Sequence, residues 1–196
     1  AWCTINPLMK AYHDQEWGVP LHDDRALFEF LMLEALQCGL SWDLILKKRE
    51  ALKEAFRGFD PLTIATFGER DVTRIMATDG VIHSERKIRA VIKNARAYLA
   101  VAKEYGSFDR YLWGYTKGKT LFYKGHGTGT LPTANGLSRA ISRDLKKRGF
   151  SFVGPVTIYS YLEAVGVIND HDESCPRYQA LFSLSDAVWA DPFEES

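Results

Sequence analysis

The sequence lacks any long apolar run. Every segment as long as the roughly 20 residues that a membrane helix needs is interrupted by charged side chains. The first ten residues, AWCTINPLMK, also lack the basic flank and apolar stretch that are typical of a secretory signal. We therefore expect no membrane span and no exported form, which makes the cytoplasm the predicted location.

Cysteine is scarce, with only Cys3, Cys38 and Cys175 in 196 residues. An odd number leaves at least one thiol unpaired, and a chain of this length buries enough apolar surface to fold without disulfides. The cysteines are therefore predicted to be reduced or to bind a metal. The sequence also lacks a Walker loop, a dinucleotide-binding glycine motif, a serine nucleophile elbow and a zincin helix, which excludes those enzyme classes.

The chain has no excess of charge of either sign, because 25 lysine and arginine residues balance 25 aspartate and glutamate residues. This balance argues against the basic footprint of a nucleic-acid-binding protein. The distribution is uneven, however, since residues 170–196 contain seven acidic residues and one basic residue. The preceding part of the chain therefore carries a basic excess of six and still offers phosphate groups a favourable field.

Apolar side chains recur at intervals of three and four residues, and no alternation typical of strands is sustained. This pattern predicts a nearly all-α fold. Capping residues and helix breakers place the helices at about 23–37, 41–56, just after 61, 70–77, 84–103, 107–115, 136–148 and 154–165. The glycine-rich interval 116–135 is predicted to be a long loop. Residues 1–176 form the predicted domain, as two packed helical lobes, and residues 177–196 an acidic tail in which an amphipathic helix is the alternative.

Four possible metal ligands lie near the two ends of the sequence: Cys3, His13, His171 and Cys175. His171 and Cys175 face the same way if they share one helical turn, and two thiolates with two imidazoles complete a tetrahedral zinc shell. Such a closed site would be structural and would join the two ends of the domain. The alternative is four unrelated residues, because a His-x-x-x-Cys spacing is common by chance.

A second group combines one carboxylate with aromatic residues: Tyr12, Trp17, Glu34 and Trp42. Glu34 lies within the apolar segment LFEFLMLEALQCGL, where an ionised carboxylate is costly unless it has a partner. The commoner partner for a buried acid is an arginine in the core. The other interpretation is a pocket in which Glu34 accepts a hydrogen bond from a flipped base that stacks on the tryptophans.

The segment Asp79–Ser84 joins two predicted helices and contains Gly80 and Val81. A helix, a tight turn and a capped second helix present backbone N–H groups that suit a phosphate, and Arg86 and Lys87 follow at once. This arrangement is typical of a helix-hairpin-helix grip on a DNA backbone. The alternative, which these residues by themselves favour, is an ordinary helical corner with a solvated basic face. A second basic run, at 139–148, is as ambiguous.

Several motifs occur together in a known order. They are YHDQEWGVP at 12–20, Leu33-Glu34, GLSW at 39–42, LKKRE at 46–50, Lys87-Ile88, NARAYL at 94–99, LKKRGF at 145–150, FVG at 152–154 and NDH at 169–171 with Cys175. Over residues 3–176 the chain resembles the DNA-3-methyladenine glycosylase I family. The resemblance is weaker at Cys3, because many relatives have a longer spacing to the histidine and an aromatic residue after the cysteine, whereas Trp2 precedes Cys3 here. We assign Trp2 no role in the pocket.

The resemblance implies the helix-hairpin-helix glycosylase fold with one structural zinc ion bound by Cys3, His13, His171 and Cys175. It implies a base pocket of Tyr12, Glu34 and Trp42, with Trp17 close by. Leu40, which follows Gly39 on the turn between two helices, matches the residue that fills the space left by the flipped nucleotide, and an apolar wedge suits that task. The implied partners are double-stranded alkylated DNA and free 3-methyladenine as product, with the protein acting as a monomer.

The implied reaction is hydrolysis of the N-glycosidic bond of 3-methyladenine, which leaves an abasic site. Methylation at N3 makes the base cationic, so it departs without being protonated by the enzyme and no strong general acid is needed. Glu34 is the predicted catalytic residue, since it both recognises the base and supports the positive sugar in the transition state. The alternatives are a non-catalytic module that binds damaged DNA and a zinc-stabilised helical protein whose aromatic residues are only core.

Overall fold

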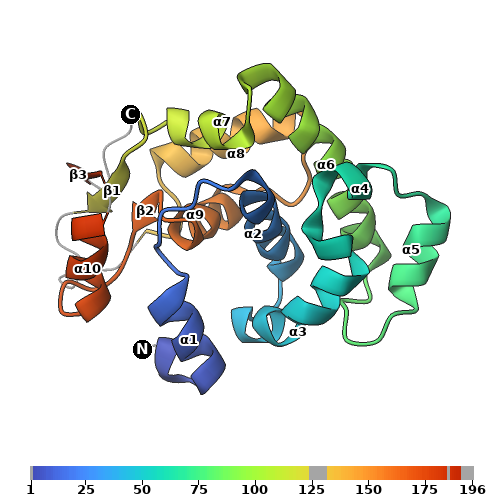
Figure 1. Ribbon diagram of the computed structural model, residues 1–196, viewed down its shortest axis with the longest axis horizontal. Helices are drawn as coiled ribbons and strands as arrows, with labels where there is room; N and C mark the ends of the chain where they lie inside the picture. The colour runs from blue at the N-terminus through green and yellow to red at the C-terminus, as the bar shows by residue number, and fades with distance from the viewer. Residues whose placement is uncertain (1, 124–131, 185, 191–196) are drawn as a thin grey trace.

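The structure is a computed structural model, and it describes residues 2–123, 132–184 and 186–190. The fold is mostly helical (Figure 1). In chain order its helices and strands are η1 (Trp2–Thr4), α1 (Pro7–Gln15), α2 (Asp24–Gln37), α3 (Trp42–Ala55), η2 (Arg57–Phe59), α4 (Pro61–Ala65), α5 (Glu69–Met76), α6 (Glu85–Tyr105), α7 (Phe108–Gly114), β1 (Thr120–Tyr123), α8 (Gly136–Lys147), α9 (Pro155–Ala164), β2 (Ile168–Asn169), α10 (Pro176–Leu184) and β3 (Ala187–Ala190).

Side-chain caps set the starts of the helices. Asp23, Ser41 and Ser84 each accept a hydrogen bond from a backbone N–H in the first turn of α2, α3 and α6. These caps explain why the predicted helices at 23–37, 41–56 and 84–103 agree with the structure within about two residues. Helix α1 was not predicted, although Asn6 caps it and Pro7 occupies its first turn, a position that suits proline.

Helix α2 is the centre of the core. Every residue from Leu27 to Leu36 is buried, and α3, α6, α7 and α9 pack around the helix (Figure 1). A helix that is apolar on all sides is stable only when other elements cover it. The two acidic residues in this stretch, Glu29 and Glu34, are consequently inside the protein, and each needs its own explanation.

The structure also contains a small parallel sheet with the strand order β2-β1-β3, in which Leu121 pairs with Ile168 and Val188. The prediction of a loop over 116–135 was therefore wrong for Thr120–Tyr123, while residues 124–131 of that interval lie outside the described part of the chain. Strands of two to four residues are too short for an alternating pattern, and a buried parallel strand need not alternate at all.

Residues 176–190 contain α10 and β3, apart from residue 185, which is not described. Tyr178 and Leu181 of α10 are buried against Phe122 of β1. This packing supports the amphipathic helix that we gave as the alternative to a weakly ordered tail. Among the described helices, none is both long and apolar enough to cross a membrane.

Candidate functional site

A cavity of about 250 Å³ opens between η1, α1, α2, α3 and α9. It brings together all four residues of the predicted aromatic and carboxylate group. The lining residues are Trp2, Met9, Tyr12, Trp17, Glu34, Gln37, Trp42, Ser160 and Glu163. Cavities lined by aromatic side chains with a few polar groups are typical of small-molecule sites.

Aromatic rings form most of the wall. The ring centroids of Tyr12 and Trp42 lie 5.4 Å apart, and those of Trp2 and Trp17 lie 5.2 Å apart at nearly a right angle. Trp2 thus belongs to the cavity, which corrects the decision to give it no role. An aromatic residue beside Cys3 was the sequence feature that could have identified Trp2 as a cavity residue. It was set aside because it precedes Cys3, whereas the aromatic residue of many relatives follows the cysteine.

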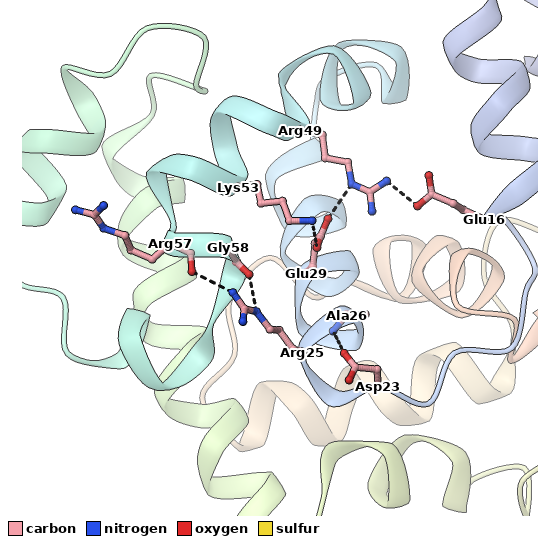
Figure 2. Close-up of polar contacts among 9 residues, drawn as sticks. All are labelled: Glu16, Asp23, Arg25, Ala26, Glu29, Arg49, Lys53, Arg57 and Gly58. Carbon is pink, nitrogen blue, oxygen red and sulfur yellow. Dashed lines mark hydrogen bonds and ion pairs between the residues drawn. The ribbon is translucent and has the colours of Figure 1, made fainter.

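The two buried glutamates of α2 differ in their partners. Figure 2 shows Glu29 bonded to Arg49, at 2.8 Å, and to Lys53, at 3.5 Å, so it is the acid with the core ion pair. Arg49 also reaches Glu16 at 2.7 Å. Glu34, which is 4% exposed, forms no salt bridge with any residue that the structure describes. The arginine partner that we considered for Glu34 therefore belongs to Glu29.

Burial raises the pKa of Glu34 to about 8. An ionised carboxylate loses its hydration in a buried aromatic cavity, and no cation in the described part of the chain pairs with Glu34 to offset that loss. Glu34 is thus predominantly protonated at neutral pH while the cavity is empty. A cation that entered the cavity would favour the ionised form, so the site is suited to a positively charged ligand.

Trp42 contributes an unsatisfied donor. Its indole N–H is buried and has no hydrogen-bond partner among the described residues. A buried N–H without an acceptor costs about 1 to 3 kcal/mol, a loss that a bound acceptor would remove. The cavity therefore offers a ligand both a donor from Trp42 and a carboxyl group from Glu34.

The turn between α2 and α3 lies at the edge of this cavity. Gly39 is exposed and has a φ of 82°, a left-handed conformation that favours glycine. The amide of Gln37, a cavity residue, donates to the carbonyl oxygen of Leu40 at 2.6 Å. Leu40 itself is partly buried against the core. The predicted wedge residue is thus held by a side chain that also lines the cavity.

The helical corner between α5 and α6 contains Gly80 and Val81, as predicted for residues 79–84. Val81 is buried. The ammonium of Lys48 donates to the carbonyl oxygens of Gly80, at 3.0 Å, and Val81, at 3.1 Å. Lys87, which we predicted to contact DNA, turns inward and donates to the carbonyl oxygens of Leu36 and Cys38 at 2.7 Å. Lys87 therefore caps the end of α2 and supports the turn at Gly39.

A second helical corner, between α8 and α9, was missed as a candidate site. Phe152 has a φ of 59° there, and α9 begins at Gly154-Pro155 without a side-chain cap. The corner borders a basic cleft of about 460 Å³, lined by Arg86, Arg89, Ala90, Lys93, Lys146, Phe150, Ser151 and Phe152. The signals in the sequence were the Gly-Pro start of α9 and the basic run before it.

The two corners and the turn at Gly39 are in contact. The guanidinium of Arg86 lies over the Phe152 ring at 4.8 Å, and the thiol of Cys38 lies 3.4 Å from the hydroxyl of Thr157 in α9. Lys87 completes the connection to the end of α2. The turn, the start of α6 and the corner before α9 therefore form one continuous part of the protein. We call this part the corner surface.

Three of the four predicted metal ligands converge. The possible ligand atoms of His13, His171 and Cys175 lie within 4.8 Å of one another, and Cys3 does not belong to this group. His13 Nδ1 contacts Asp14 at 2.8 Å and His171 Nδ1 contacts Asn169 at 2.9 Å, so each ring can donate from Nδ1 and keep a lone pair on Nε2. This pattern is typical of histidines that bind a metal.

Comparisons with known proteins agree with this geometry. A family model described as methyladenine glycosylase matches residues 2–178. The chain is 42% identical to DNA-3-methyladenine glycosylase 1 of Escherichia coli (strain K12) over 177 residues, which cover 90% of this chain and 95% of that protein. It is 41% identical to DNA-3-methyladenine glycosylase of Haemophilus influenzae (strain ATCC 51907 / DSM 11121 / KW20 / Rd), with 89% and 95% covered.

Solved structures agree as well. A variant of 3-methyladenine DNA glycosylase I in complex with 3-methyladenine superposes with a TM-score of 0.84 at 40% identity, covering 90% of this chain and 95% of that one. A second crystal structure of 3-methyladenine DNA glycosylase I gives a TM-score of 0.85 at 43% identity, with 89% and 96% covered. The overall fold is therefore shared with these two structures of 3-methyladenine DNA glycosylase I.

Proposed function

Because the chain belongs to the methyladenine glycosylase family, we propose that it hydrolyses the N-glycosidic bond of 3-methyladenine in alkylated DNA and that the base is bound beside Glu34. The observation that carries this proposal is a buried glutamate without a salt bridge among the described residues, in a cavity walled by aromatic rings. An aromatic pocket with a carboxyl group that ionises when a cation binds suits a flat, cationic ring.

The cationic charge of the base supplies the selectivity. Adenine methylated at N3 carries a positive charge while it is attached to DNA, and the faces of Tyr12 and Trp42 attract a cation. Glu34 ionises as the cation enters, and charge-assisted hydrogen bonding then adds to the attraction. Each contact contributes about 1 to 3 kcal/mol. Normal adenine gains neither contribution, because it is neutral.

In the chemical step, the C1′–N9 bond breaks and its electron pair returns to the ring, so that the base leaves as a neutral molecule. Water forms the new bond to C1′ and releases a proton to solvent. Glu34 stabilises the positive charge that moves onto the sugar. Because no lysine lines the described cavity, no amine is placed to form a covalent intermediate, and the product is an abasic site.

The corner surface, in our proposal, holds the DNA. The free N-terminus of α9 and the basic cleft beside it suit phosphate groups. Leu40 then fills the space left by the flipped nucleotide. The proposed helix-hairpin-helix grip includes the corner between α8 and α9, in addition to the corner at Gly80. At Gly80, Lys48 binds the two carbonyl oxygens and Lys87 turns inward.

We also propose that His13, His171 and Cys175 bind one structural zinc ion. Their donor set fits zinc, and the 3.8 Å between His13 Nε2 and Cys175 Sγ is close to the separation of about 3.6 Å that tetrahedral Zn–N and Zn–S bonds give. His171 Nε2 is buried and has no hydrogen-bond partner in the described part of the chain. Burial also lowers the pKa of His171 to about 4, so its ring is neutral.

Gly18 makes room for this cluster, because a Cβ atom there would lie 2.8 Å from the His171 ring. When bound, zinc would join α1 to the segment that precedes α10. Cys3, which we predicted as a fourth ligand, remains outside this group of three.

The activity is tested by release of free base from alkylated DNA under single-turnover conditions. The wild-type chain should release 3-methyladenine and leave an unbroken abasic strand. Glu34→Gln should lower the rate at least ten-fold, because an amide cannot supply the negative charge. A wild-type rate for Glu34→Gln would exclude the catalytic role of Glu34, and absence of release by the wild type would favour a module that only binds damaged DNA.

A further inference from the structure

Glu163 of α9 lines the same cavity as Glu34 of α2. It has no part in the proposed bond cleavage. We propose that Glu163 is a second specificity-determining residue, whose carboxyl oxygen accepts a hydrogen bond from the exocyclic amine of the bound base. The inference rests on the proposed function, because it assigns a further contact to the same ligand.

A second carboxyl group lies near Glu163. The neighbouring carboxyl group of Asp170 adds to the effect of burial in raising the pKa of Glu163, and Asp170 accepts a hydrogen bond from the hydroxyl of Tyr159 at 2.7 Å.

The surroundings of Glu163 favour its neutral form. Burial, and then the neighbouring carboxyl groups of Asp170 and Glu34, raise the pKa of Glu163 well above the usual range. A neutral Glu163 adds no negative charge to the cavity, and its carbonyl oxygen can accept a hydrogen bond from the ligand.

The chemistry of the base leaves one donor for this oxygen. A 3-methyladenine ring that is attached to a sugar has no ring N–H, and its exocyclic amine supplies its two N–H donors. Two carboxyl groups line the cavity, Glu34 and Glu163, so each can accept from one of these N–H groups. The indole N–H of Trp42 is the complementary donor for a ring nitrogen.

The test compares two free ligands that differ only in the amine, 3-methyladenine and 3-methylpurine, by quenching of tryptophan fluorescence. Glu163→Ala should weaken binding of 3-methyladenine about ten-fold and change binding of 3-methylpurine less than two-fold. Glu163→Gln is the matched control, because its neutral amide keeps the size of the side chain and a carbonyl oxygen for the ligand. It should bind both ligands like the wild type.

The outcomes are separable. If the wild type binds neither ligand, the proposed function fails. If the wild type binds both, and Glu163→Ala weakens both by the same factor, Glu163 has only a structural role and the inference is overturned. A Glu163→Gln variant that loses 3-methyladenine as strongly as Glu163→Ala overturns it too. Should Glu163→Ala fail to fold by circular dichroism, Glu163→Met, which keeps the volume, replaces it in the same comparison.

Discussion

Two buried glutamates on one helix show how a partner decides what a carboxyl group does. Glu29 and Glu34 lie five residues apart on α2 and are almost equally buried. Arg49 and Lys53 neutralise Glu29 (Figure 2), whereas Glu34 faces aromatic rings without a cation. An unpaired buried carboxyl group costs stability, and proteins keep such groups where the charge is needed for binding or catalysis.

The cost of Glu34 should appear as a pH dependence of folding. Its pKa is about 8 in the folded protein, against 4.5 without perturbation. Between these values the folded protein holds a proton that the unfolded chain releases, so the stability that Glu34 contributes falls as the pH rises. Compared with Glu34→Gln, the wild type should lose about 3.5 kcal/mol in free energy of unfolding between pH 5 and pH 8.

Urea unfolding of both proteins at several pH values measures this difference. Glu29→Gln is the matched control, and it should be destabilised throughout the range from pH 5 to pH 8, because it removes one of the two carboxylates that Arg49 binds. Parallel stability curves for the wild type and Glu34→Gln would show that the Glu34 pKa is not raised.

Four of the nine residues that line the cavity were predictable from the sequence. An acid within an apolar helix and nearby aromatic residues pointed to Tyr12, Trp17, Glu34 and Trp42, and the structure brings them together. Glu163 and Trp2 were not predictable in this way, because α9 and η1 reach the cavity only through tertiary packing. Arg49 pairs with Glu29 and not with Glu34 because of the way α3 packs on α2, and spacing in the sequence does not determine that packing.

At the scale of elements, the turn between α2 and α3 separates DNA binding from base binding. Leu40→Ala should lower excision from duplex DNA about ten-fold, because a smaller side chain replaces less of the lost stacking. Binding of free 3-methyladenine should stay within two-fold of the wild type. Leu62→Ala, an exposed leucine on α4, is the control and should leave both measurements unchanged. Equal losses in both assays would mean that Leu40 supports the cavity instead of acting on DNA.

The proposed metal cluster connects α1 to the segment before α10. Cys175→Ser should remove zinc, measured by metal analysis after dialysis, and lower the Tm by several degrees. Cys3→Ser should keep about one zinc ion per chain, since Cys3 lies outside the group of three. Loss of zinc from Cys3→Ser would restore Cys3 as a ligand, and a wild-type protein without zinc would exclude the site.

Helices were easier to predict than strands because their signals are local. Asp23, Ser41 and Ser84 cap helices within one turn of their own position. The three strands, by contrast, are defined only by each other: Leu121 is a strand residue because Ile168 and Val188 lie beside it. A sheet assembled from such distant, short segments leaves no periodic pattern in any one of them.

For the whole molecule, the distribution of charge matters more than its sum. The chain is neutral, yet Arg86, Lys93 and Lys146 gather at one cleft, while Arg89 there is paired with Glu69 and Glu85. Net charge therefore gave misleading evidence against DNA binding, because the fold concentrates cations from α6 and α8 at this cleft.

Salt dependence tests this arrangement. Lys93→Ala and Lys146→Ala should each weaken binding to undamaged duplex DNA and reduce the slope of log affinity against log salt by about 1, as expected when one phosphate contact is lost. Binding of free 3-methyladenine should not change. Lys103→Ala, near the far end of α6, is the control. An unchanged slope in both cleft variants would place the DNA elsewhere on the protein.

Helix α9 extends from the corner surface to the cavity, since it starts at Pro155 and carries Ser160 and Glu163 in its later turns. A helix rises about 1.5 Å per residue, so roughly 12 Å separates its first residue from Glu163. This length is fixed because the helix is rigid. In the proposed arrangement, only the nucleotide at that distance from the bound phosphates can enter the cavity, so the protein must move along the DNA by one nucleotide to test the next base.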